Sequence, residues 1–388
     1  MRAIKIKTKS LMDFLFIAVI VFNLTGCIKE GKNDVVHPTA QNIIDKGSIN
    51  TFIDKTNLIH HAFSNYFDKI NTTVIGTNDK DKKDFFGEII DLEIDNKHNI
   101  WIVDSQNSQI KIFDMNKNFI SAFGSIGDGP NEFRNIVGIE IIGDSLLTAE
   151  GLGKIKIFKF NFENKQETFK LIDQYTVHSI DDFCHTKNYI FISGVHTNGA
   201  SIENGNYIHR INNQGKIDLS FGELYKSKNW LVSLQLSRGS IECNPDNNLI
   251  LSNIEHAPYI HAFNESGKKT WIDQIKPFQH VRILSGYRGT LPYIQFQNQE
   301  NHDRIINFSI LENKNIAIQI LESNQGIIEK LKSTINPTLP LYNIVLNIKE
   351  NKPILVNKGF DYKIESMSEK HFVGYQNHPY PHVIIIKK

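Results

Sequence analysis

The chain has almost no net charge. Its 388 residues carry 43 basic and 42 acidic side chains, for a formal net charge of +1. Proteins that bind nucleic acid usually present a strongly basic face, so this balance gives no electrostatic case for a nucleic-acid partner. Long stretches of alanine and leucine are also missing, whereas Ile, Asn, Lys and Phe are abundant. This composition favours strands over helices.

The chain also lacks a convincing membrane span. Lys5, Lys7 and Lys9 precede an apolar run over 14–22, but a transmembrane helix needs about 20 apolar residues. A basic start, a short apolar run and small residues after it are typical of a signal peptide.

The residues after this run, Leu24-Thr25-Gly26-Cys27, resemble the lipobox of bacterial lipoproteins. The resemblance implies that residues 1–26 are a signal peptide and that Cys27 carries acyl chains that anchor the protein to a membrane. The residue after the cysteine is Ile28, which resembles the pattern of lipoproteins sent to the outer membrane. The sequence does not choose between the periplasmic and the surface face of that membrane. The alternative is a plain signal peptide with an incidental cysteine. Residues 27–56 are polar and aperiodic, which predicts a tether.

Only 3 cysteines are present, and processing would leave Cys184 and Cys243 as ordinary thiols. An exported protein can form a disulfide, but the two Cα atoms would have to lie within about 7 Å. The sequence favours two buried free cysteines. Neither has a neighbouring His or Asp that would indicate a catalytic nucleophile.

Short strands separated by polar turns recur along the chain. In residues 87–136 an alternating strand is followed by three more, with turns such as Asp95–Asn99 between them, and this pattern predicts a four-stranded antiparallel meander. Copies follow at intervals of about 55 residues, the scale of a propeller blade. The further copies include 143–158, 188–216, 246–268, 312–318 and 368–374.

Six such copies predict a closed ring, because a single blade cannot cover both of its faces. The last copy supplies only three strands before the chain stops, and residues 71–75 are the candidate for the missing one. We therefore expect an all-β fold: a six-bladed β-propeller of four-stranded antiparallel blades over residues 57–388, with an N-terminal strand that closes the last blade.

The stretch FGSIGDGPNEF at 123–133 is rich in glycine. It lacks the Gly-Lys-Ser/Thr of a P-loop and the spacing of a dinucleotide-binding loop, and no helix pattern follows it. It lies between the fourth strand of one copy and the first strand of the next. We interpret it as a turn between blades, with Phe123 and Phe133 packed at the junction.

The run over 95–113 and the glycine-rich stretch resemble NHL repeats. With the lipobox, the chain resembles six-bladed β-propeller lipoproteins of Gram-negative bacteria, in the TolB-like superfamily. That family has no settled activity, and related propellers include protein-binding scaffolds, sugar-acid lactonases and lyases. The fold alone does not choose among these functions.

Ligands of propellers bind at one mouth of the central channel, on loops and inner strands. The candidate ligand-binding residues near the predicted first strands are Glu132, Arg134, Asp182, His185 and Glu242. His185 beside Asp181-Asp182 could act as a base or a metal ligand; the alternative is a solvated turn followed by an ordinary strand residue.

No catalytic signature accompanies these candidates. Gly-x-Ser-x-Gly is absent, and the sequence assigns no metal site and no cofactor. We expect a monomeric binding or assembly module for a protein, peptide or glycan, attached to the membrane through Cys27. The alternative is a cell-envelope enzyme, similar to a lactonase or lyase, with a divalent cation in the channel.

Overall fold

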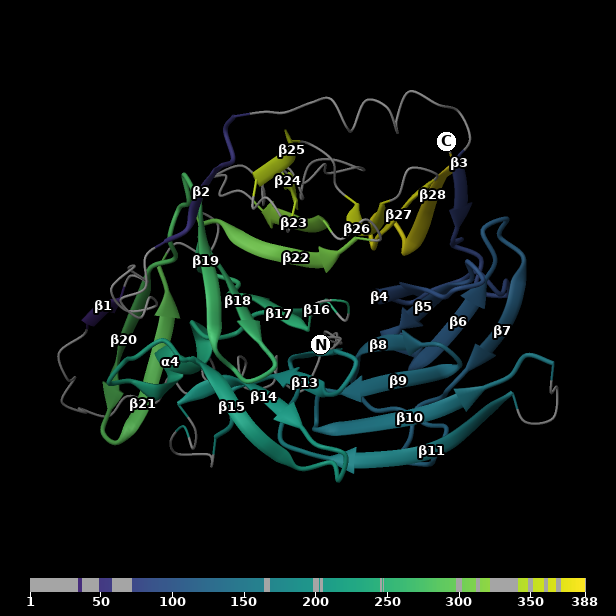
Figure 1. Ribbon diagram of the computed structural model, residues 1–388, viewed down its shortest axis with the longest axis horizontal. Coiled ribbons are helices and arrows are strands. Elements are labelled where there is room, and N and C mark those ends of the chain that lie inside the picture. Colours follow the sequence, from purple (N-terminus) through teal and green to yellow (C-terminus); the bar gives the residue numbers. More distant parts are fainter. Residues whose placement is uncertain are drawn as a thin grey trace, which may run out of the picture.

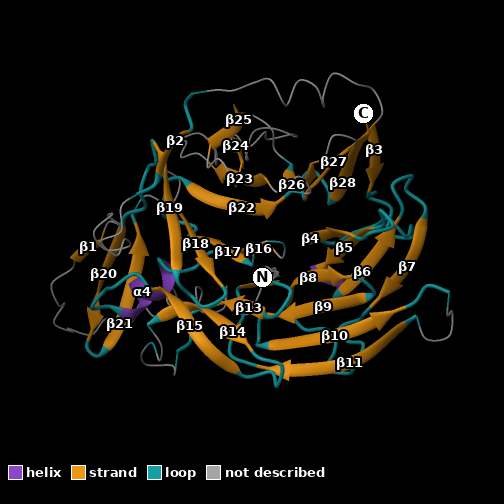
Figure 2. Ribbon diagram, in the orientation of Figure 1, coloured by secondary structure: helices purple, strands orange, loops and turns teal. Residues whose placement is uncertain are grey.

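The computed structural model is a ring of β-sheets around a common axis (Figure 1). It describes residues 34–36, 49–57, 72–163, 168–197, 202, 205–244, 246, 248–297, 302–311, 315–321, 341–347, 352–358, 362–367 and 371–387. Strands dominate these residues, beside the short helix α4 (Trp230–Gln235) and a 3₁₀ turn at Ser105–Asn107 (Figure 2). No helix within them has the length and apolar character needed to cross a membrane.

Six sheets form the blades, and each begins with an inner strand beside the axis. Blade 1 contains β4 (Ile89–Ile94), β5 (Ile100–Asp104), β6 (Gln109–Phe113) and β7 (Phe119–Phe123). Blade 2 contains β8 (Ile136–Ile142), β9 (Ser145–Glu150), β10 (Lys154–Phe160) and β11 (Phe169–Thr176). Blade 3 contains β12 (Asp182–His185), β13 (Ile190–Ser193), β14 (Asn206–Ile211) and β15 (Ile217–Glu223).

The remaining blades follow in the same order. Blade 4 contains β16 (Ile241–Asn244), β17 (Leu249–Asn253), β18 (Tyr259–Asn264) and β19 (Lys269–Lys276). Blade 5 contains β22 (Arg304–Ile310), β23 (Asn315–Leu321), β24 (Leu341–Asn347) and β25 (Lys352–Lys358). Blade 6 contains β26 (Lys363–Met367), β27 (His371–Gln376), β28 (His382–Lys387) and β3 (Thr72–Ile75). The predicted all-β, six-bladed propeller is confirmed.

The ring closes where the two ends of the propeller share blade 6. β3 pairs antiparallel with β28, with Ile75 opposite Val383 and Thr72 opposite Ile386. Ile75 is fully buried and packs in one cluster with Phe86 of the following loop. The missing strand predicted at 71–75 is therefore confirmed.

Two strands come from the segment expected to be a polar tether. β2 (Thr51–Asp54) pairs parallel with β19 and adds a fifth strand to blade 4. Ile53 of this strand is fully buried, and the Lys55 ammonium lies 2.6 Å from the buried Asp303 carboxylate. β1 (Asp34–Val36) pairs with a separate hairpin, formed by β20 (Ile283–Arg288) and β21 (Leu291–Phe296). One apolar contact and one buried ion pair thus hold β2 against blades 4 and 5.

The glycine-rich loop 124–135 connects β7 with β8 and is a turn between blades, as the sequence indicated. Gly124 has φ +97°, and a Cβ at this position would lie 2.6 Å from the Phe133 ring. The Phe123 and Phe133 rings pack edge to face with centroids 5.6 Å apart. Lys156, fully buried on β10, donates to the Gly129 carbonyl at 3.0 Å and to the Glu132 carbonyl. The loop is thus held by the blade that it enters.

Cys184 and Cys243 form a disulfide, with Cα atoms 5.4 Å apart. The expectation of two free cysteines is wrong. β12 and β16 are the inner strands of consecutive blades, and this arrangement brings the two side chains together although 59 residues separate them in sequence.

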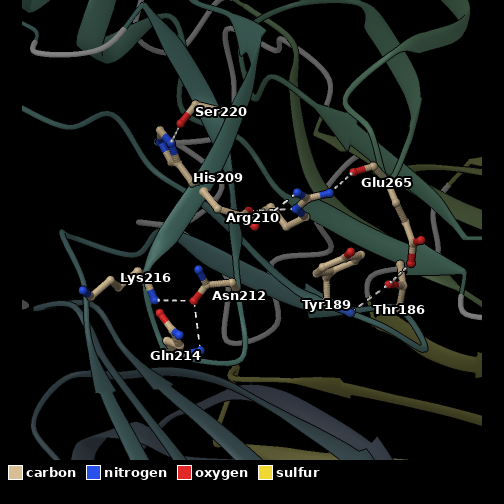
Figure 3. A network of polar contacts seen from close by, with 10 residues as sticks. Thr186, Tyr189, His209, Arg210, Asn212, Gln214, Lys216, Ser220 and Glu265 are labelled. Atoms are coloured by element: carbon tan, nitrogen blue, oxygen red, sulfur yellow. Dashed lines mark hydrogen bonds and ion pairs between the residues drawn. The ribbon is translucent and has the colours of Figure 1, made fainter.

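Blades 3 and 4 are also joined farther along the same sheets (Figure 3). The Arg210 guanidinium of β14 donates to Asp218 Oδ1 at 2.9 Å and to the Glu265 carbonyl of blade 4 at 3.0 Å. Glu265 in turn accepts hydrogen bonds from the side chains of Thr186 and Asn188 in blade 3. These contacts join the two sheets.

Candidate functional site

Acidic side chains gather on the inner strands around the axis of the ring. We call the following six residues the axial carboxylates: Asp91 and Glu93 of β4, Glu140 of β8, Asp182 of β12, Glu242 of β16 and Glu365 of β26. They come from five of the six blades, and all six are half-buried. The repeat explains this gathering, because equivalent strands of successive blades place their side chains beside the same axis.

Repulsion between these side chains shows how close they lie. The pKa of Glu242 is raised by burial and then by the charges of Glu140 and Asp182, and also by those of Glu93 and Glu365 on more distant blades. The pKa of Glu93 is raised by burial and by the charges of Glu140 and Asp91. The carboxylates therefore act as one electrostatic group rather than as separate surface residues.

Two axial carboxylates also tie neighbouring blades together. Asp91 Oδ2 accepts a hydrogen bond from the Ile139 backbone N–H of blade 2 at 2.7 Å. Asp182 Oδ2 accepts one from the Ile241 backbone N–H of blade 4 at 3.0 Å. These bonds orient the side chains and lower the pKa of each, but burial outweighs them.

Burial brings several of these groups into the physiological pH range. It raises the pKa of Asp91 to about 6, that of Asp182 to about 7 and that of Glu365 to about 8. Water and protein dipoles stabilise a carboxylate less well inside a protein than in solution, so the neutral acid is favoured. Near neutral pH Asp91, Asp182 and Glu365 can therefore exchange protons, and a cation placed beside them would favour the ionised forms.

A histidine and a lysine lie beside the axial carboxylates. His185 Nδ1 lies 2.8 Å from Glu140 Oε2, and both side chains are less than one-fifth exposed. The positive charge of Lys363 on β26 lowers the pKa of Asp91 and of Glu365, against the larger effect of burial. The pair formed by Glu140 and His185 provides a proton donor and acceptor beside the other axial carboxylates.

The structure brings three of the five sequence candidates together at the axis. Asp182 and Glu242 are axial carboxylates, and the charge of Asp182 raises the pKa of Glu242. His185 pairs with a third axial carboxylate, Glu140. The other two serve the loop before β8. Glu132 Oε2 accepts a hydrogen bond from the Gly129 backbone N–H at 2.8 Å, and Arg134 pairs with Asp128 at 2.8 Å on the exposed surface.

Sequence reasoning missed Asp91, Glu93, Glu140 and Glu365. The signal for the first two was present, since acidic residues alternate with apolar ones in the run Ile89–Ile94. Glu140 and Glu365 each stand alone in a strand. The only sequence signal for these two residues is their position in the first strand of a repeat, which predicts a place beside the axis.

The axial carboxylates surround the axis without meeting at one point. Among the residues that the structure describes, no three His, Cys, Asp or Glu side chains are arranged to hold a metal ion. Carboxylates spread around a ring suit a ligand with separated positive charges or hydrogen-bond donors.

Comparison with known proteins gives the fold and no family. No protein-family model matches the sequence, and no curated protein is similar enough to be a relative. Solved structures resemble it in fold. A member of the DUF4221 family from Bacteroides vulgatus has a TM-score of 0.53 and 9% identity, over 82% of this chain and 96% of that one. A protein from Bacteroides fragilis assigned as exported has a TM-score of 0.54 and 10% identity, over 87% of this chain and all of that one. At these identities the likeness shows a shared fold.

Proposed function

We propose that this protein is an exported, lipid-anchored β-propeller that binds a positively charged group of a protein, peptide or glycan at its axial carboxylates. One observation carries the proposal: six acidic side chains from five blades lie on the inner strands around one axis, with His185 and the ammonium of Lys363 beside them. Gathering like charges costs stability, and such clusters are common at functional sites. A ligand cation would relieve that repulsion.

The location of the protein rests on its first residues and on its neighbours in fold. The lipobox-like Leu24-Thr25-Gly26-Cys27 supports a lipid anchor at Cys27 and an outer-membrane position, facing the periplasm or the surface. A protein of the same fold from Bacteroides fragilis is assigned as exported, which supports export of this chain as well. We also propose that the chain is related to the NHL-repeat and TolB-like propellers that its repeats resemble.

Calorimetric titration tests the proposed binding. The full chain in detergent is titrated with spermidine as a cationic probe and with maltohexaose as a neutral one. We expect spermidine to bind the wild type and to bind a Glu140→Gln/Glu242→Gln variant at least about tenfold more weakly, which corresponds to about 1.4 kcal/mol. Glu223→Gln, at the half-exposed ion pair with Lys226, is the matched control and should bind like the wild type. Equal affinity of the double variant, or binding of maltohexaose alone, would contradict the cation site.

The pair formed by Glu140 and His185 favours a second function. An imidazole 2.8 Å from a carboxylate, beside acids with raised pKa values, is an arrangement used for general acid–base catalysis. A cell-envelope enzyme similar to a lactonase or lyase, with a divalent cation on the axis, would use it. Titration of the same chain with Ca²⁺ separates the two functions: a heat signal lost in the double variant and no spermidine binding would favour the enzyme.

A further inference from the structure

The hairpin β20–β21 is an addition to the propeller and belongs to none of its blades. It lies between blade 4 and blade 5 in sequence, and at one rim of the ring in space (Figure 1). Arg288 pairs with Leu291, so the turn has two residues. Gly289 in this turn has φ +65°, and a Cβ built on it would meet no atom within 4 Å. The tip therefore stands clear of the rest of the described chain.

The base of the hairpin is held firmly. Ile283 is buried in a cluster with Ile272 of blade 4, and Ile294 and Phe296 pack against the same cluster. The Asn229 side-chain amide donates to the Tyr293 carbonyl at 3.0 Å, and the Tyr287 hydroxyl donates to the Lys228 carbonyl at 3.0 Å. These contacts present the tip in one orientation.

The tip carries the residue types of a membrane interface. Leu291 is 72% exposed, the highest value among the described large hydrophobic side chains, and Tyr287 is 38% exposed. Arg288 is the only charged residue between Ile283 and Phe296, and its guanidinium lies 5.3 Å from the centroid of the Tyr293 ring. An aliphatic side chain, tyrosines and one arginine are enriched where proteins meet lipid headgroups.

The chain that leads to the membrane passes along this hairpin. β1 pairs with β20, with Asp34 opposite Ser285. Cys27 stands 7 residues before Asp34, a stretch that spans at most about 25 Å when fully extended. A lipid on Cys27 would therefore keep the β1–β20–β21 sheet close to the bilayer.

A second exposed aromatic side chain lies on β2, the edge strand of blade 4. Phe52 of β2 is 56% exposed, and the Lys276 ammonium lies 3.7 Å from the centroid of its ring. Lys228, beside Tyr287, is exposed as well. Lysines beside exposed apolar side chains favour an anionic lipid surface.

We propose that the tip of the β20–β21 hairpin is a second membrane contact, which rests the propeller with one rim against the bilayer to which Cys27 is anchored. This inference rests on the proposed lipid anchor. Contact at the rim would leave both ends of the axis facing the aqueous compartment.

Tryptophan quenching in vesicles tests this contact. Leu291→Trp and the control Ile172→Trp are made in the full, lipidated chain. Ile172 is 54% exposed on β11 of blade 2, away from the hairpin (Figure 1). Each variant is reconstituted in phosphatidylethanolamine–phosphatidylglycerol vesicles with and without doxyl-labelled lipid, and the emission of the wild type is subtracted. We expect doxyl lipid to reduce the emission of the tryptophan at 291 and to leave that at 172 unchanged.

Flotation of the same vesicles separates this inference from the anchor. If the chain floats with the vesicles and the two tryptophans are quenched equally or not at all, the hairpin contact is wrong while the anchor stands. If the wild-type chain does not float, the anchor is wrong and the hairpin contact falls with it.

Discussion

Lys156 and Glu150 form a buried ion pair at the junction of blades 1 and 2. The two side chains are almost completely buried, with Lys156 Nζ 3.4 Å from Glu150 Oε1. Glu150 Oε2 also accepts a hydrogen bond from the Arg134 backbone N–H at 2.7 Å, and Lys156 donates to two carbonyls of the glycine-rich loop. Blade 1 repeats the arrangement with Lys111 and Asp104, 3.5 Å apart. The pair therefore recurs in these two blades, where Lys111 and Lys156 each bond the loop that precedes their blade.

Removal of the Lys156 ammonium should strongly destabilise the fold. Lys156→Met leaves the Glu150 carboxylate buried without its partner, which costs about 3–5 kcal/mol. The control is Lys154→Met on the same strand, whose partner Asp128 is 63% exposed at 3.8 Å and whose loss should cost less than about 1 kcal/mol. Denaturant unfolding measures both values. Equal effects of the two substitutions would contradict the structural role of the buried pair.

The disulfide should be formed when the protein is made in an oxidising compartment, and it should add stability. Cys184 and Cys243 close a loop of 59 residues, for which loop entropy gives about 4 kcal/mol. We expect thiol titration of the denatured, unreduced protein to detect neither residue, and Cys243→Ser to lower the free energy of unfolding. Two reactive thiols in protein from an oxidising compartment would contradict the pairing.

Closure of the ring should depend on the N-terminal strand β3. Ile75→Ala removes a fully buried side chain at the joint with β28 and should cost about 2–5 kcal/mol. Val74, adjacent on the same strand, is only half-buried, so Val74→Ala should cost less. Urea unfolding of both variants compares them, and a similar small cost for each would mean that β3 does not close the blade.

Stability should depend on pH through the axial carboxylates. The pKa of Glu242 is raised in the folded protein by burial and by neighbouring acids, so its contribution to stability is present below its unfolded pKa and is lost as pH rises. Glu242→Gln removes that loss. We expect the Tm of the variant to exceed that of the wild type by roughly 2 °C or more at pH 8.5, and the difference to shrink towards pH 4.5.

Buried histidines change the pH dependence of stability in the opposite direction, and their effect cancels when the variant is compared with the wild type. Burial lowers the pKa of His196 to about 3 and that of His256 to about 4, so their contributions are lost as pH falls. They are the same in the wild type and in Glu242→Gln, and they cancel in the Tm difference. A difference that is constant from pH 4.5 to pH 8.5 would contradict the raised pKa of Glu242.

The sequence predicted the blades because their signal is local. Apolar strands such as Ile100–Asp104 and polar turns such as Asp95–Asn99 recur in the same order along the chain. The last copy lacks one strand, which predicted that β3 completes it. The hairpin β20–β21 was not predicted, because Tyr287, Tyr293 and Phe296 fall outside the period of the repeat.

The site was predicted only in part because it exists only in the closed ring. Asp182 and Glu242 were found from their place before or within a first strand, whereas their repulsion with Glu93 and Glu365 arises between blades that are far apart in sequence. The pairing of Cys184 with Cys243 has the same origin. Proximity around an axis leaves no local pattern, so composition and spacing could not reveal it.

Proton release on ligand binding tests the axial site most directly. Burial places the pKa of Asp91 at about 6, that of Asp182 at about 7 and that of Glu365 at about 8, so at pH 6.5 part of the site is protonated. A bound cation favours the ionised carboxylates and must release protons to the buffer. The measurement is the heat of spermidine binding at pH 6.5 in two buffers of different ionisation enthalpy. We predict different heats that report net proton release; identical heats in the two buffers, or no binding at all, would contradict the account.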